Sequence, residues 1–163
     1  HYGNEHGITD QNIREQMYRA ILSGAFGQIY GNAPQWYFSS AVANSFADVK
    51  KQDWKKKLDS FGANYLPMVA ELMAEFPMET LVPDHDNRVL TSGFWSESNG
   101  YPPISYSSNL AIAYLPDEKP VTIDTSVFDN ELELSWRNPA NAQEIAGGII
   151  PNDGIKQFIP PNL

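Results

Sequence analysis

The sequence predicts an α+β protein in which helices precede a β-rich part. Apolar residues recur at intervals of three and four over residues 11–24 and again over 62–76, which is the spacing of helices with one buried face. From Leu81 onward the apolar residues alternate, and the alternating runs are separated by turn dipeptides such as Asn-Gly and Asn-Pro. The change of period divides the chain into a helical part, residues 1–77, and a β-rich part, residues 78–163.

Turn and capping residues limit both predicted helices. Thr9 or Asp10 suits the start of the first helix, because a side-chain oxygen there accepts a free backbone N–H of the first turn. Gly24 or Gly27 suits its end, because glycine enters the left-handed region without steric cost. The second helix contains Pro67, which either opens the helix in its first turn or kinks it.

The β-rich part is expected to contain several short antiparallel strands. The alternating runs cover residues 88–94, 110–115, 121–124 and 132–136. Short strands at near-regular spacing with turns between them are typical of a sandwich. We therefore expect an antiparallel β-sandwich after the helices.

A stretch punctuated by glycines, residues 23–38, connects the first helix to the irregular residues 39–60. Gly27 and Gly31 bracket a short apolar piece, residues 28–30, which has room for one buried strand. A helix, a glycine turn, a short strand and an aromatic-lined loop follow one another in α/β barrels, which present functional side chains at the carboxyl ends of their strands.

Composition limits the partners of the chain. Its 163 residues have a net charge of −9, so phosphate backbones repel it and nucleic acid is not an expected partner. The lysines between residues 50 and 57 are those of a solvated face. There is no cysteine, which excludes disulfides and thiolate metal sites, and no apolar run approaches the roughly 20 residues of a membrane span. Aromatic residues make up 12% and favour carbohydrate, because aromatic rings stack on sugar rings.

Several short motifs follow one another in a specific order. They are "SGAFGQIYGN", Trp36, "DW", "LD", "GA", "LVPD" and a β-rich tail with "WRNP" and "FIPP". From about Tyr2 to Pro161 this order resembles the apiosidase-like family of bacterial glycoside hydrolases, a (β/α)8 barrel followed by a β-sandwich that is labelled collagen-binding. A complete barrel needs roughly 250 residues. The resemblance therefore implies a C-terminal portion, with the last helix–strand–helix elements of the barrel, its eighth strand at residues 28–30, and most of the sandwich.

The resemblance also implies an activity and a location. The reaction would be hydrolysis of a glycosidic bond in a complex plant or algal polysaccharide by a pair of carboxylates, without a cofactor. The family's catalytic Glu would precede His1, so no catalytic residue is assigned within the chain. Many relatives have a His where Gln28 stands, so an imidazole role is not expected there. A secreted or periplasmic location is implied by the resemblance alone.

Five residues are predicted to contact substrate. Tyr30 would stand at the carboxyl end of the eighth strand, and Trp36 and Tyr37 in the loop that follows, where indole and phenol rings can stack on sugar. The alternative is that these three rings fill the core between helix and strand. Tyr2 and Glu5 lie in the loop before the first helix, where Glu5 is either a hydrogen-bond acceptor for substrate or a solvated carboxylate.

No metal site is predicted. His1, His6 and His85 lack the spacing of zinc ligands. Asp84 and Asp86 flank His85 in "LVPDHD", where a turn that joins the two parts is favoured over calcium chelation.

Two alternatives to an enzyme part remain open at the level of the sequence. One is a carbohydrate-binding module that uses exposed aromatic residues of the sandwich, and the other is a structural piece that supplies barrel elements to a partner chain. The sandwich aromatics are also explained as core, and they are Phe94, Trp95, Tyr101, Tyr106, Tyr114, Trp136 and Phe158.

Overall fold

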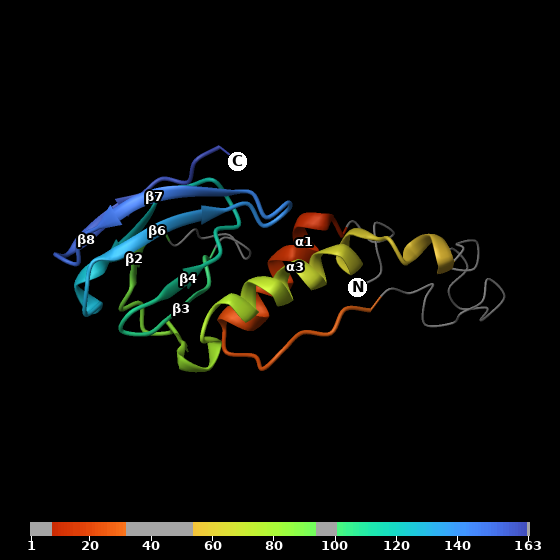
Figure 1. Ribbon diagram of the computed structural model, residues 1–163, viewed down its shortest axis with the longest axis horizontal. Helices are drawn as coiled ribbons and strands as arrows, with labels where there is room; N and C mark the ends of the chain where they lie inside the picture. Colours follow the sequence, from red (N-terminus) through yellow and green to blue (C-terminus); the bar gives the residue numbers. More distant parts are fainter. Residues whose placement is uncertain (1–7, 32–53, 94–100, 163) are drawn as a thin grey trace.

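The computed structural model describes residues 8–31, 54–93 and 101–162, which form a helical part and a β-rich part side by side (Figure 1). The helical elements are α1 (Asp10–Leu22), η3 (Trp54–Lys57), α3 (Phe61–Glu75), η4 (Met78–Thr80) and η5 (Thr125–Val127). The strands are β1 (Val82–Pro83), β2 (Leu90–Ser92), β3 (Ile104–Tyr106), β4 (Ala111–Ala113), β5 (Val121–Asp124), β6 (Leu132–Arg137), β7 (Glu144–Ile150) and β8 (Ile155–Phe158). The α+β class is therefore confirmed.

Helix α1 begins and ends at signals that the sequence contains. Thr9 is the N-cap, and it forms a reciprocal capping box with Asn12, whose backbone N–H donates to the Thr9 hydroxyl. At the other end Ser23 is the C-cap, and Gly24 follows in the left-handed region with φ of 90°. The predicted helix over residues 11–24 is thus confirmed with its ends shifted by one or two residues.

Helix α3 runs from Phe61 through Pro67 to Glu75 without a break. Ser60 is its N-cap but makes no side-chain capping hydrogen bond. The helix confirms the prediction over residues 62–76. Neither helix of the described part has the length and apolar character that crossing a bilayer requires.

The β-rich part contains three small antiparallel sheets rather than one continuous ladder. Their strand orders are β1-β3-β4, β2-β5-β8 and β6-β7. All four predicted strands are present, although β2 and β4 are shorter than expected. Strands β1, β3, β7 and β8 were not predicted: β1 spans two residues, and β7 contains Gly147 and Gly148, which interrupt its alternation. Whether the three sheets amount to a sandwich stays a prediction.

Two apolar cores stabilise the described chain. The first joins α1 and α3 through Met17, Leu22 and Val69, and it includes Tyr114, which directly follows β4. The second lies within the β-rich part and is built around Val89, Leu90, Ile104, Val121 and Phe128. The first core therefore crosses from the helices to the sheets, and the division at residue 77 stays a prediction.

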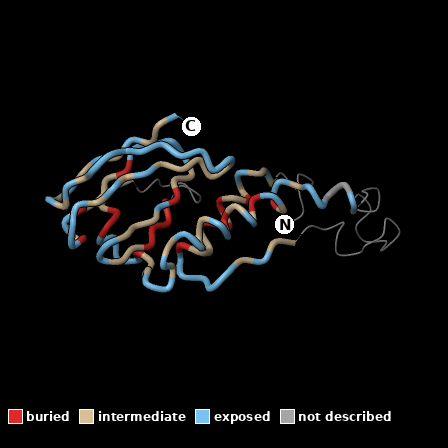
Figure 2. Tube along the Cα trace, in the orientation of Figure 1, coloured by how far each residue is buried: buried red, intermediate tan, exposed pale blue. Residues whose placement is uncertain are grey.

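The segment between the helices, residues 25–31, corrects one expectation. Residues 28–30 form no strand, because none of the described residues offers them a ladder. The segment is extended and mostly exposed (Figure 2). Phe26 is 110% exposed and Ile29 92%, so both side chains lie in solvent although their residue types favour burial.

Candidate functional site at the start of the helices

Helices α1 and α3 run in the same direction, and residues 25–31 between them run in the opposite direction. Figure 1 shows α1 and α3 side by side and pointing the same way, while residues 25–31 return alongside them. Arg14, in the second turn of α1, donates to the hydroxyl of Tyr65 in the second turn of α3 at 2.6 Å, as expected for parallel helices. The helices of an α/β barrel likewise run parallel to one another, and the chain between them returns in the opposite direction and ends beside the starts of the helices.

The end of the helical part at which both helices begin is therefore the candidate functional site. We call it the helix-start end: the first turns of α1 and α3 with Tyr30 and Ser60. In barrel enzymes the loops at this end contact substrate. The predicted site residues Tyr2, Glu5, Trp36 and Tyr37 lie outside the described residues.

Tyr30 is the one predicted site residue that the structure describes. Its hydroxyl lies 3.3 Å from the hydroxyl oxygen of Ser60, the N-cap residue of α3. Its ring lies over Gly62, where a Cβ atom would stand 2.3 Å from two ring carbons. The side chain is half-buried and packs against the helical core. Tyr30 thus has one edge in the core and its hydroxyl at the start of α3.

The absence of a side chain at Gly62 makes this position of Tyr30 possible. Gly62 occupies the second position of α3, where glycine is costly for helix stability. The close approach of the Tyr30 ring explains why a small residue is needed there. Sequence patterns mark such a glycine only as an irregularity within a helix.

Aromatic and cationic side chains lie in η3 and at the start of α3. In η3 the Lys55 ammonium lies 5.9 Å from the centroid of the Trp54 ring. Phe61 and Tyr65 stack on each other with centroids 6.2 Å apart, and Phe61 is 58% exposed. The exposed ring of Phe61 is suited to stacking on a sugar ring.

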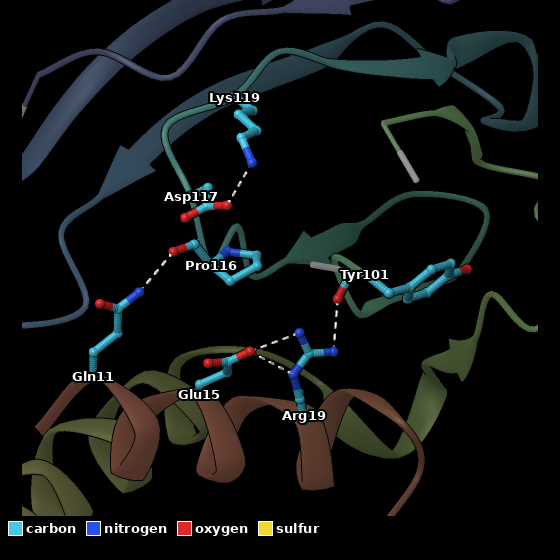
Figure 3. A network of polar contacts seen from close by, with 7 residues as sticks. All are labelled: Gln11, Glu15, Arg19, Tyr101, Pro116, Asp117 and Lys119. Carbon is cyan, nitrogen blue, oxygen red and sulfur yellow. Dashed lines mark hydrogen bonds and ion pairs between the residues drawn. The ribbon is translucent and has the colours of Figure 1, made fainter. Parts of the chain in front are cut away.

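Glu15 is a buried carboxylate that the sequence analysis did not single out. It is 6% exposed, and both the Nε and the Nη2 of Arg19 donate to its Oε1 at 2.9 and 2.7 Å. The side chains of this pair face the β-rich part and not the helix-start end (Figure 3). Because its charge is already matched, Glu15 is a structural carboxylate and no candidate for acid catalysis.

A small hollow lies between α3 and the turn from β6 to β7. It is lined by Glu71, Glu75 and Arg137 among others, and its volume is about 70 Å³. Sites for small-molecule ligands typically measure about 300 to 1,000 Å³. The hydrogen bond from Arg137 to Glu75 raises the pKa of the guanidinium above its usual value, and the two side chains form an ion pair at 3.0 Å. The hollow is too small to hold a sugar ring.

Asp84 has the turn role that the sequence favours. Its carboxylate is 5% exposed and accepts hydrogen bonds from the backbone N–H groups of Arg88, Val89 and Leu90 at 2.8, 3.1 and 2.8 Å. Both of its oxygens are thus occupied by backbone donors. Within the described residues no group of three His, Asp or Glu side chains is arranged to hold a metal ion.

The aromatic residues of the β-rich part do not form an exposed row in the described chain. Tyr114 is buried, and Tyr106, Trp136 and Phe158 are half-buried. Tyr101 is 38% exposed and donates its hydroxyl hydrogen to Asn87. Phe94 and Trp95 lie outside the described residues.

Comparisons with known proteins agree with this arrangement. Residues 1–80 match the family model "Apiosidase-like, catalytic domain". A solved structure named as a glycoside hydrolase superimposes with a TM-score of 0.83 at 21% identity, covering 99% of this chain and 36% of the other. A glycoside hydrolase family 5 structure from Bacteroides vulgatus ATCC 8482 superimposes with a TM-score of 0.82 at 20% identity, covering 94% of this chain and 33% of the other.

These matches also set the extent of the similarity. The chain spans about a third of the length of the two solved structures. A comparison with curated protein sequences gave no match. Both structural neighbours contain the helical and the β-rich part together, since they cover nearly the whole chain. Residues 1–80 are therefore similar to the catalytic domain of apiosidase-like glycoside hydrolases.

Proposed function

We propose that the chain is part of a longer glycoside hydrolase that acts on a complex polysaccharide, and that it contributes the substrate side of the active site. The observation that supports this most is the helix-start end, where Tyr30 lies at the end of an extended segment between two parallel helices. In a barrel, that position faces the substrate. The match of residues 1–80 to an apiosidase-like catalytic domain supports the same function.

The exposed apolar residues of the linking segment fit a role as a barrel strand. Phe26 and Ile29 are fully exposed, while a strand of a barrel is buried on both faces. A neighbouring strand on each side would cover them and supply the missing ladder. We propose that residues 28–30 become the eighth strand when the rest of the barrel is present, as the one-third coverage of the structural neighbours suggests.

The substrate contacts are assigned by position. Tyr30 would donate or accept a hydrogen bond through its hydroxyl, and Trp36 and Tyr37 would stack on sugar rings. Tyr2 and Glu5, before α1, would approach from the neighbouring loop, with Glu5 accepting a sugar hydroxyl. The catalytic carboxylate pair would belong to other residues of the longer protein. Secretion or export to the periplasm fits a polysaccharide substrate.

The role proposed for the β-rich part is that of an accessory unit. Its described aromatic residues are mostly buried or half-buried, which favours a supporting role over an independent carbohydrate-binding surface.

The experiment is an assay of the longer protein on plant and algal polysaccharides, with Trp36→Ala and Tyr30→Phe as variants. We expect hydrolysis by the wild type, a higher KM in Trp36→Ala, and a smaller loss in Tyr30→Phe. Trp136→Phe, in β6 on the β-rich part, is the matched control and should behave as the wild type. Hydrolysis that is unaffected by Trp36→Ala would contradict the assignment of the substrate face.

A further inference from the structure

We propose that the β-rich part fixes helix α1 along its whole length and so positions the first turn of α1 at the helix-start end, with Gln11, Arg19 and Tyr114 as positioning residues. That this end contacts substrate rests on the proposed function, whereas the fixing of α1 does not. The proposal gives the β-rich part a task in the arrangement of the active site.

The first contact is at the start of α1. Gln11, the second residue of the helix, donates from its side-chain amide to the backbone carbonyl of Pro116 at 3.0 Å (Figure 3). Pro116 lies in the loop between β4 and β5. The first turn of α1 is therefore bonded to the β-rich part close to the residues that precede the helix.

The second contact lies in the middle of α1. Arg19 pairs with the buried Glu15 and donates from its Nη1 to the carbonyl of Tyr101 at 2.7 Å. The carboxylate contacts two nitrogens of the guanidinium, Nε and Nη2, and so orients the third nitrogen, Nη1, toward the loop before β3 (Figure 3). Because Glu15 is nearly inaccessible to water, this pair is screened less than a surface pair.

An aromatic contact lies beside the ion pair. The rings of Tyr18 and Tyr114 stack with centroids 4.6 Å apart and an angle of 7° between their planes. Both residues are buried, at 6% and 5% exposure. Flat stacking of two buried rings restricts rotation and sliding of α1 against β4, because either movement separates the rings.

The last contact is at the end of α1. The hydroxyl of Ser105 in β3 donates to the carbonyl of Leu22, the final residue of the helix, at 2.8 Å in a buried position. The contacts thus extend from Gln11 to Leu22, about 16 Å along the helix axis. Helix α3 also packs against α1. A helix held at both ends and in the middle cannot tilt independently of the sheets.

The absence of cysteine allows a direct test on the chain itself. Asp10→Cys at the start of α1 and Glu133→Cys in β6 would place two unique nitroxide labels, and pulsed electron paramagnetic resonance would measure the distribution of distances between them. We expect a narrow distribution in the parent background. Tyr114→Leu should broaden it, and Tyr114→Phe, which keeps the stacked ring, should restore it.

A second variant keeps the test informative if Tyr114→Leu does not fold. Gln11→Ala combined with Arg19→Lys removes the amide contact with Pro116 and the guanidinium contact with Tyr101 but keeps a cation beside the buried Glu15, so it should broaden the distribution without loss of helix content. Asp153→Asn, in an exposed pair with Lys156 far from α1 in sequence, is the matched control and should leave the distribution narrow. A distribution that stays narrow in folded Tyr114→Leu and in the double variant would overturn the proposal.

Activity of the longer protein provides the link to function. We expect Tyr114→Leu to lower kcat/KM and Tyr114→Phe to recover it, which a requirement for the phenol hydroxyl would not produce. A longer protein that hydrolyses no glycoside would overturn the proposed function and leave the distance measurement valid. Normal kcat/KM in Tyr114→Leu, together with a broadened distribution, would overturn the positioning role.

Discussion

The ring of Tyr18 in α1 lies flat against the ring of Tyr114 next to β4, and this pair belongs to the core that joins the helices to the β-rich part. We predict that Tyr114→Ala lowers the free energy of unfolding by about 3 kcal/mol, because it removes a buried ring and the stacking contact of that ring with Tyr18. Tyr114→Phe should cost less than about 1 kcal/mol, since the stack remains. Urea denaturation of both variants measures the difference, and equal losses would contradict the importance of the stack.

The same tyrosine predicts a loss of stability at high pH. Burial raises the pKa of Tyr114 to about 12, with smaller contributions from neighbouring charges. In the unfolded chain the phenol ionises near its ordinary pKa of 10. The contribution of the protonated Tyr114 phenol to the free energy of unfolding is therefore complete below pH 10 and is lost as the pH rises toward 12. Unfolding midpoints measured across this range should fall less steeply in Tyr114→Phe, and parallel curves would contradict the prediction.

The carboxylate of Asp84 is predicted to be essential for the turn before β2. Asp84→Ala leaves three backbone N–H groups without their acceptor, two of them buried, and should lower the free energy of unfolding by about 3 kcal/mol. Asp117→Ala removes an exposed carboxylate and is the matched control, with an expected effect below about 0.5 kcal/mol. Faster hydrogen exchange at Val89 and Leu90 should accompany the loss, and unchanged exchange would show that other contacts hold the turn.

Gly62 tests the position of Tyr30. Gly62→Ala should displace the Tyr30 ring, because a Cβ atom would stand 2.3 Å from it, and the contact between Tyr30 and Ser60 should be lost. Alanine ordinarily favours a helix by about 1 kcal/mol over glycine, so a net loss of stability would report the clash. Gly27→Ala meets nothing within 4 Å and serves as the control. A variant Gly62→Ala that is more stable than the parent would refute the placement of the ring.

Exposed apolar residues predict how the isolated chain behaves. Phe26 and Ile29 lie in solvent on an unpaired extended segment, so the chain should bind a hydrophobic dye or associate. Phe26→Ser with Ile29→Thr should reduce both effects. Ile155→Thr, at an exposed position of β8, is the control for a general loss of apolar surface. A monodisperse chain that binds no dye would contradict the prediction.

Local patterns in the sequence predicted the elements whose stability is local. The spacing of Ile13, Met17 and Ile21 determines α1, and its capping residues are adjacent in the chain. Strand β7 was missed because its exposed residues and two glycines give no alternating signal. The pairing of Tyr18 with Tyr114 was missed because periodicity indicates which face of an element is buried but not what covers it.

The candidate site was predictable only in part. Tyr30 was identified from its place at the carboxyl end of a short apolar piece, and the structure adds Ser60 and Gly62 as its neighbours. Those two residues carry no chemical signature in the sequence. The assignments of Trp36 and Glu5 depend on the family resemblance and stay predictions.

The composition of the two cores has a consequence for the order of folding. The core of the β-rich part draws only on residues that follow Asp84, so it can form from one continuous stretch of chain. The helical core needs Tyr114 and Ile112, which come after both helices in the chain. Contacts between distant parts of a chain form late, because a long loop must close first. During synthesis the core between the helices therefore stays incomplete until β4 and Tyr114 have been added. A nascent chain that stalls before β4 exposes the apolar faces of α1 and α3 to chaperones.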